Sequence, residues 1–236
     1  MKAGLQIKAL IGAAAVAGLC GLAQAGTGFS YTNGGNNLAI PDGTGTDVGG
    51  QPVFLQLTTN EPNYIIKDLN VGIIATHTWQ GDVRIWLEHV ESGQTIYLIN
   101  RPGRILPTST FGYSNDNFGN NTTLTEMIFD DSANGTYNIA ARGGVGPAAP
   151  GTTNVTGSWR ADDIAFEGFG GNSNLAQFNG MALVGTWRLW AQDFAGGDTG
   201  ALRQFSLYFT ANEIPAPGAL ALLGLAGLAG ARRRRA

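Results

Sequence analysis

The sequence contains few of the residues that cross-link a chain or bind transition metals. It has one cysteine, Cys20, and two histidines among its 236 residues. A single thiol cannot close an intrachain disulfide, and two histidines with one cysteine provide too few ligands for a structural zinc site. The fold therefore has to be stabilised by its apolar core or by ions that bind oxygen ligands.

Charged residues are scarce as well, and many of the basic ones gather at the two ends of the chain. Six of the 14 Lys and Arg residues lie in the segments 1–25 and 216–236, which contain none of the 17 acidic residues. The remaining 8 basic and 17 acidic residues give the central part a net charge of −9, against −3 for the whole chain. This negative net charge argues against a basic surface that would bind nucleic acid.

The first residues have the pattern of a secretory signal peptide. Lys2 and Lys8 flank the start of an apolar run, residues 9–22, and a small-residue cleavage site precedes Gly26. We therefore expect residues 1–25 to form a signal helix that is removed on export, together with the cysteine.

The last residues have the pattern of a membrane-held sorting signal. A proline-containing spacer leads into an apolar run, residues 218–231, and then into four arginines, residues 232–235. The apolar part is near the shortest length that spans a bilayer, and the arginines favour the cytoplasmic side. The layout of residues 212–236 resembles the PEP-CTERM sorting signal of Gram-negative bacteria, which implies an exosortase-like sorting machinery as a partner. A plain membrane anchor is the alternative.

Between these ends, apolar and polar residues alternate in short segments bounded by Gly, Asn and Asp. The clearest of these segments are residues 69–73, 83–87, 95–99, 187–191 and 205–209. A period of two predicts half-buried strands, and several in succession predict an all-β antiparallel β-sandwich or jelly roll. The full prediction adds an N-terminal signal helix and a C-terminal hydrophobic helix to this fold.

The domain boundaries follow from the same patterns. Residues 26–38 form a lead-in, residues 39–211 the β-sandwich domain, and residues 212–236 the sorting or transmembrane segment. Residues 104–121 and 143–157 are rich in Gly, Pro, Asn and Thr, which predicts long surface loops.

A series of short motifs runs through the central domain. They are Ala39-Ile40-Pro41-Asp42, His77-Thr78-Trp79-Gln80-Gly81-Asp82-Val83, Phe129-Asp130-Asp131, Phe178-Asn179-Gly180, Gly185-Thr186-Trp187-Arg188-Leu189 with Asp193, and Gly197-Asp198-Thr199-Gly200. In this order they resemble the P domain of proprotein convertases, also called the P/Homo B domain. The resemblance covers roughly residues 40–210. It implies a β jelly roll of the kind that stabilises a subtilisin-like protease domain.

The sequence does not predict an enzyme. A subtilisin-like site needs an Asp, a His and a Ser in separate motifs, and neither His77 nor His89 has the sequence context of a subtilase histidine. Asp198-Thr199-Gly200 imitates one half of an aspartic protease site, which needs two such carboxylates. We expect a turn at Asp198 and a structural role for His77, which ends a buried strand.

The aspartates at strand ends and turns are candidates for calcium ligands. They are Asp82, Asp130, Asp131, Asp193 and Asp198. Carboxylates beside backbone carbonyls suit calcium, which takes six to eight oxygen ligands and would stabilise an exported fold without disulfides. The alternative is that each carboxylate caps a turn by accepting nearby backbone N–H groups.

Tryptophan is the other candidate for a binding residue. Trp187 shares a strand face with Leu189, which predicts a place in the core. Trp86 and Trp190 fall on the opposite face from their apolar neighbours, so they either pack under a loop or form an exposed apolar patch that binds a partner such as a carbohydrate.

Two functions remain open. The first is a non-catalytic surface or extracellular-matrix protein that acts as an interaction module, with exopolysaccharide or another exported protein as its partner. The second is an accessory domain that stabilises a subtilisin-like serine protease in trans. Both place the protein in the cell envelope, on the surface or in the extracellular matrix of a Gram-negative bacterium.

Overall fold

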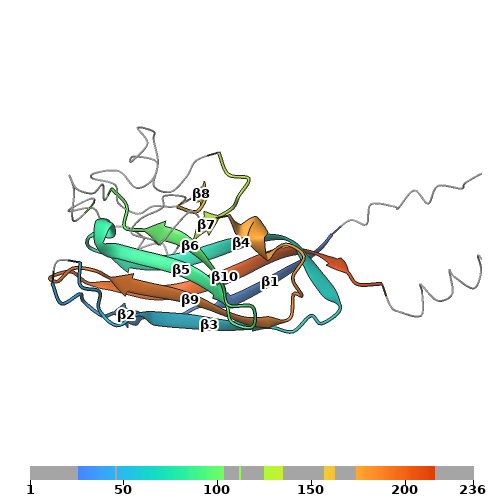
Figure 1. The fold of residues 1–236 in the computed structure, drawn as a ribbon, viewed down its shortest axis with the longest axis horizontal. Helices are drawn as coiled ribbons and strands as arrows, with labels where there is room; N and C mark the ends of the chain where they lie inside the picture. Colours follow the sequence, from blue (N-terminus) through green and yellow to red (C-terminus); the bar gives the residue numbers. More distant parts are fainter. Residues whose placement is uncertain are drawn as a thin grey trace, which may run out of the picture.

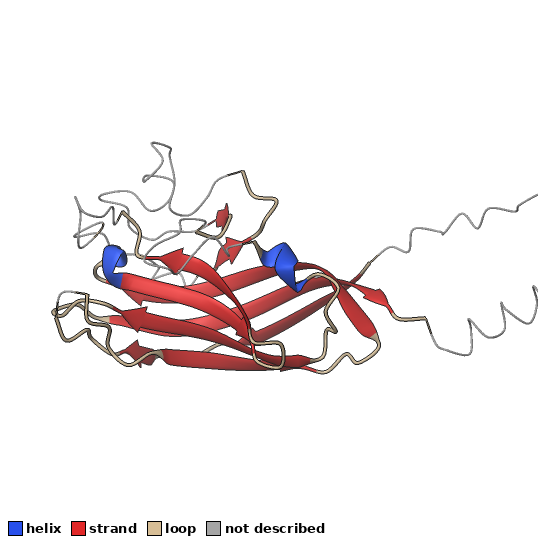
Figure 2. Ribbon diagram, viewed as in Figure 1, coloured by secondary structure: helices blue, strands red, loops and turns tan. Residues whose placement is uncertain are grey.

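The computed structural model shows a sandwich of two β-sheets (Figures 1 and 2), which confirms the predicted all-β class. It describes residues 26–45, 47–103, 112, 125–134, 157–162 and 174–215. The expected signal helix and nearly all of the expected sorting segment lie outside these residues, as do most of the two expected loops. Within them, no helix combines the length and apolar character needed to cross a bilayer.

The larger sheet has six strands, in the order β1-β10-β4-β7-β8, with β2 pairing to β10. Its strands are β1 (Thr27–Asn33), β2 (Leu38–Ile40), β4 (Tyr64–His77), β7 (Met127–Phe129), β8 (Gly157–Trp159) and β10 (Gly200–Glu213). All pairs are antiparallel except β7 with β8. Residues 26–38 therefore supply β1, which pairs with β10 along its whole length.

The smaller sheet has four antiparallel strands in the order β3-β9-β5-β6. They are β3 (Val53–Thr59), β5 (Val83–His89), β6 (Gln94–Asn100) and β9 (Gly185–Asp193). Each of the five predicted strand segments lies inside one of β4, β5, β6, β9 and β10. The period of two identified these strands because each has one face on the core.

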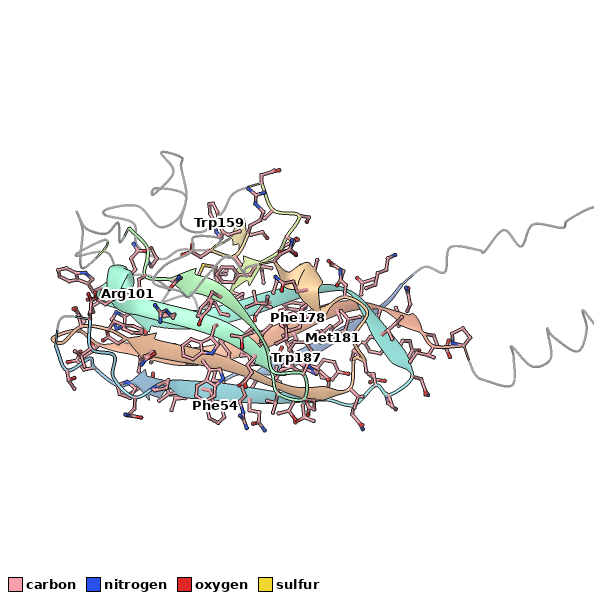
Figure 3. The ribbon with its side chains drawn as sticks, viewed as in Figure 1. Phe54, Arg101, Trp159, Phe178, Met181 and Trp187 are labelled. Atoms are coloured by element: carbon pink, nitrogen blue, oxygen red, sulfur yellow. The ribbon has the colours of Figure 1, made fainter. Side chains whose placement is uncertain are left out.

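The core lies between the two sheets, and Trp187 occupies its centre (Figure 3). Its side chain is fully buried, with its ring 5.0 Å from Phe178 and 5.6 Å from Phe209 of the opposite sheet. Burying about 200 Å² of such a ring contributes roughly 5 kcal/mol at about 25 cal/mol per Å². The predicted core position of Trp187 is confirmed.

Candidate functional site

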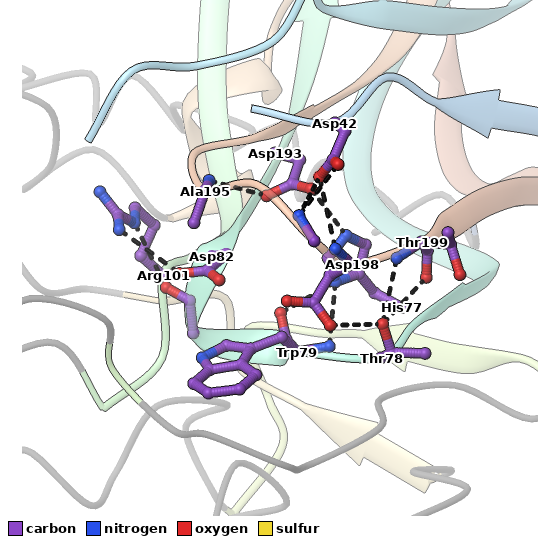
Figure 4. Close-up of polar contacts among 12 residues, drawn as sticks. Asp42, His77, Thr78, Trp79, Asp82, Arg101, Asp193, Ala195, Asp198 and Thr199 are labelled. Atoms are coloured by element: carbon purple, nitrogen blue, oxygen red, sulfur yellow. Dashed lines mark hydrogen bonds and ion pairs between the residues drawn. The ribbon is translucent and has the colours of Figure 1, made fainter. Parts of the chain in front are cut away.

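Three segments that are far apart in the sequence, around Asp42, residues 77–82 and residues 193–200, meet at one end of the sandwich (Figure 4). Strand β4 ends there at His77, β9 ends at Asp193, β10 begins at Gly200, and the 3-10 helix η1 (Gln80–Asp82) precedes β5. We call this group the strand-end cluster. It consists of Asp42, His77, Thr78, Asp82, Asp193 and Asp198.

His77 joins the two sheets through its ring nitrogens. Its Nε2 lies 3.2 Å from Asp193 Oδ2, and both side chains are fully buried. Its Nδ1 lies 3.1 Å from the backbone N of Trp79 and 2.9 Å from the Trp79 carbonyl oxygen. A neutral ring that donates from Nε2 accepts the Trp79 N–H at Nδ1, whereas a charged ring donates to the carbonyl. Both nitrogens are occupied in either state, as expected for a structural histidine.

The carboxylates next to His77 hold the turn between β9 and β10. Asp193 Oδ1 accepts the Ala195 N–H at 3.1 Å. The two oxygens of Asp42 lie 3.2 and 2.9 Å from the backbone N of Gly197. These N–H donations lower the pKa of Asp42, because they favour its ionised form.

The hydroxyl of Thr78 links β4 to the same turn. It donates to Asp198 Oδ1 at 2.7 Å and accepts the Thr199 N–H at 3.1 Å. These two hydrogen bonds of the Thr78 hydroxyl stabilise the turn at Asp198, which agrees with the turn expected there.

Asp82 differs from the other acids because its carboxylate oxygen Oδ1 has no hydrogen-bond partner while it is buried. The residue is 1% exposed, and its nearest cation is Arg101, with Nη2 at 3.6 Å from Oδ1. Arg101 also donates to Asp47 at 2.6 Å and to the Gly81 carbonyl at 3.2 Å. Burial raises the pKa of Asp82 to about 6 in spite of this cation.

The five predicted calcium ligands divide into two groups. Asp82 and Asp198 line a pocket of about 150 Å³ with Trp79, Ala195 and Gly196, and Asp193 lies in the same strand-end cluster. Asp130 and Asp131 follow β7 instead. In the described part of the chain, no three His, Cys, Asp or Glu side chains converge as metal ligands.

Turn capping accounts for Asp193, as described above, and for the two aspartates after β7. Asp130 Oδ1 accepts the Ser132 N–H at 2.7 Å, and Asp131 accepts the N–H groups of Leu175 and Ala176 at 3.1 and 2.7 Å. The last two bonds cap the 3-10 helix η3 (Leu175–Phe178) together with Asn174, whose side chain accepts the Ala176 N–H at 2.8 Å. Calcium binding at these acids stays a prediction.

The second histidine, His89, lies between a serine and an acid. Its Nδ1 is 2.9 Å from Ser92 Oγ, and its Nε2 is 3.5 Å from Glu91 Oε2. Ser92 Oγ also accepts the Gln94 N–H at 3.2 Å, and the His89 ring packs 4.5 Å from Trp187. Burial lowers the pKa of His89. These contacts close the hairpin between β5 and β6.

A second candidate site lies on the outer face of the smaller sheet. Phe54 of β3, Trp190 of β9, Trp86 of β5 and Tyr97 of β6 are direct cross-strand partners, so one aromatic residue from each strand forms a continuous line. We call this line the aromatic row.

The rings of the aromatic row contact one another in sequence across the sheet. Phe54 and Trp190 have ring centroids 4.5 Å apart, Trp190 and Trp86 are 5.7 Å apart with planes 3° from parallel, and Trp86 and Tyr97 are 6.3 Å apart. Phe54, labelled in Figure 3, is 38% exposed and the other three rings are partly exposed. Of the alternatives for Trp86 and Trp190, the structure shows the partly exposed patch.

A row of polar side chains runs beside the aromatic row on the same face, two residues along each strand. They are Gln56, Arg188, Glu88 and Thr95. Arg188 Nε donates to Gln56 at 3.1 Å, its Nη1 lies 3.9 Å from Glu88, and Trp190 Nε1 donates to Glu88 at 2.7 Å. The polar row therefore fixes the orientation of the tryptophan next to it.

Comparisons with known proteins do not place the chain in a family. No family model and no curated protein matches the sequence. The chain is similar to the crystal structure of a serine protease of Aeromonas sobria, with 16% identity and a TM-score of 0.39, and to the same protease in complex with a chaperone, with 13% identity and a TM-score of 0.34. Each match covers 79% of this chain and 26% of the other. Likeness at this level carries no argument about activity.

Arg101, Phe54 and Tyr97 were not predicted from the sequence as residues of these sites. Arg101 was missed because no motif contains it, and its role depends on the burial of Asp82. Phe54 and Tyr97 were missed because their contribution requires the register of four strands. Their outward position in alternating segments was a usable signal, but only together with that register.

Proposed function

We propose that this protein is a non-catalytic, exported interaction module that binds its ligand through the aromatic row. The observation that carries this proposal is the line of four partly exposed rings across a whole sheet. Side chains on the solvent face of an antiparallel sheet are ordinarily polar. Contiguous exposed aromatic surface is typical of binding sites, where such rings supply large contact areas.

The bonding of His77 supports the non-catalytic part of the proposal. A general base needs a ring nitrogen within reach of a nucleophile, and both nitrogens of His77 are engaged by Asp193 and Trp79. The neighbouring hydroxyl of Thr78 is bonded to Asp198 and Thr199. A structural link between the sheets accounts for these contacts of His77 and Thr78.

The terminal sequences support the cellular part of the proposal. The signal-peptide pattern of residues 1–25 and the PEP-CTERM-like pattern of residues 212–236 favour export, sorting by an exosortase-like machinery and retention at the surface or in the matrix of a Gram-negative bacterium.

A sedimentation assay tests the interaction function. The purified full chain, in mild detergent, is mixed with extracellular matrix isolated from a Gram-negative exopolysaccharide producer, and the bound fraction is measured. We expect the wild type to sediment with the matrix and Trp190→Ala to stay largely in solution. Val184→Ala is the matched control, because Val184 has the same 38% exposure as Phe54 but lies outside the aromatic row. Equal sedimentation of the wild type and Trp190→Ala would refute the proposal.

A second candidate is an accessory domain that stabilises an exported serine protease in trans. It is favoured by the P-domain-like motifs, several of which meet in space at the strand-end cluster. The test is to co-express the full chain with a secreted subtilisin-like protease from which the P domain has been deleted. Recovery of protease activity only in the presence of this chain supports the candidate, and unchanged activity removes it.

A further inference from the structure

We infer that the aromatic row takes a neutral polysaccharide chain, which lies across the four strands with sugar rings packed on the aromatic side chains. The inference rests on the proposed interaction function and names its ligand class. The ligand has to match three properties of the aromatic row, namely its length, its charge and its narrow width.

The length of the row indicates an extended ligand. Neighbouring strands lie about 4.8 Å apart, so four rings on four adjacent strands cover about 14 Å. The measured centroid separations of 4.5, 5.7 and 6.3 Å agree with one ring per strand. A ligand with repeated apolar faces, such as an oligosaccharide, can contact successive rings, whereas a single small molecule contacts one or two.

The charges around the row indicate a neutral ligand with many hydroxyl groups. Arg188 and Glu88 lie 3.9 Å apart and compensate each other, and Arg84 is 4% exposed, with its guanidinium 4.5 Å from the Phe194 ring centroid. No uncompensated charge of either sign is therefore presented by these side chains. Gln56 and Thr95 are the uncharged polar side chains beside the rings, and a neutral polar rim of this kind suits sugar hydroxyls rather than carboxylates or sulfates.

The width of the row argues against a second protein as the occupant. Four aromatic side chains of about 200 Å² each, none exposed by much more than a third, offer at most about 300 Å². A stable protein interface buries about 800 Å² on each partner. The flanking polar row limits the extension of the apolar strip on one side, and sugar rings combine a narrow apolar face with a polar rim.

Direct binding measurements test the ligand class. The full chain in mild detergent is titrated with cellohexaose, a neutral β-glucan fragment, and with an alginate oligomer as the acidic counterpart, and binding is followed by tryptophan fluorescence and calorimetry. We expect binding of the neutral oligomer, about tenfold or greater weakening in Trp86→Ala, and unchanged binding in Val184→Ala. Phe54→Ala, at the most exposed ring, is the second variant and tests the row should truncation of Trp86 disturb folding.

The outcomes separate the ligand class from the proposed function. Matrix binding that depends on Trp190 without neutral-oligosaccharide binding, or with stronger alginate binding, overturns the ligand class and leaves the interaction function standing. A dimer in sedimentation velocity that dissociates in Phe54→Ala assigns the row to a second copy and also overturns it. If the wild-type protein does not bind the matrix at all, the proposed function itself is refuted.

Discussion

The buried carboxyl group of Asp82 predicts a specific dependence of stability on pH. The substitution Asp82→Asn keeps the size of the side chain and removes its ability to ionise. Arg101, whose Nη2 lies 3.6 Å from Asp82, keeps its 2.6 Å contact with Asp47. The variant therefore isolates the cost of the buried negative charge.

The magnitude and sign of the effect follow from the pKa. Burial raises the pKa of Asp82 from 3.8 to about 6 in the folded protein. Each tenfold change in proton affinity is worth about 1.4 kcal/mol, so the shift corresponds to about 3 kcal/mol. Because the folded pKa is raised, this contribution is fully present below pH 3.8 and is lost as the pH rises through about 6. Above that range, ionised Asp82 makes the wild type less stable than Asp82→Asn.

Urea denaturation of the two proteins at a series of pH values measures this difference. We expect nearly equal free energies of unfolding near pH 4 and an advantage for Asp82→Asn of about 3 kcal/mol at pH 8. Glu213→Gln, at an exposed carboxylate, is the control and should show no such change across the range. A constant difference between Asp82→Asn and the wild type would show that Asp82 does not titrate in this window.

Other predictions concern the strand-end cluster, the cap of η3 and the absence of catalysis. A Cβ at Gly200 would lie 2.3 Å from His77 Cδ2, so Gly200→Ala should destabilise the fold by about 1–3 kcal/mol in urea denaturation. Gly28→Ala is the control, because the nearest atom to its Cβ would be 4.0 Å away and no loss of stability is expected. Equal destabilisation by the two substitutions would contradict the prediction. Asp131→Ala should cost about 1 kcal/mol, because the Leu175 N–H loses its side-chain acceptor while Asn174 still accepts the Ala176 N–H, and an unchanged midpoint would exclude a capping role. Millimolar calcium should raise the melting temperature and a chelator lower it; identical melting curves would remove the calcium hypothesis. The full chain should not hydrolyse casein, and hydrolysis that disappears in His77→Ala would overturn the non-catalytic proposal.

Parts of the strand-end cluster could be predicted because the relevant signals are local. His77 ends a buried strand and is followed by a turn, which was enough to predict a structural histidine. Outside this cluster, Asp130 directly follows β7 and caps a turn two residues on, which is a local signal, whereas the bonds of Asp131 to η3 span 44 and 45 residues and could not be predicted. The pairing of His77 with Asp193 could not be predicted, because 116 residues separate them and the two strands belong to different sheets.

The sequence by itself determined five of the ten strands that the structure describes, β4, β5, β6, β9 and β10, and which face of each meets the core, because a pleated strand places alternate side chains on opposite sides. It also determined the acidic balance of the central domain and the lack of cross-linking cysteines. The tertiary structure alone decided that Phe54, Trp190, Trp86 and Tyr97 form one line, because strand order and register depend on packing between distant segments. It likewise decided that Asp82 is buried beside Arg101, since burial is a property of the assembled sheets.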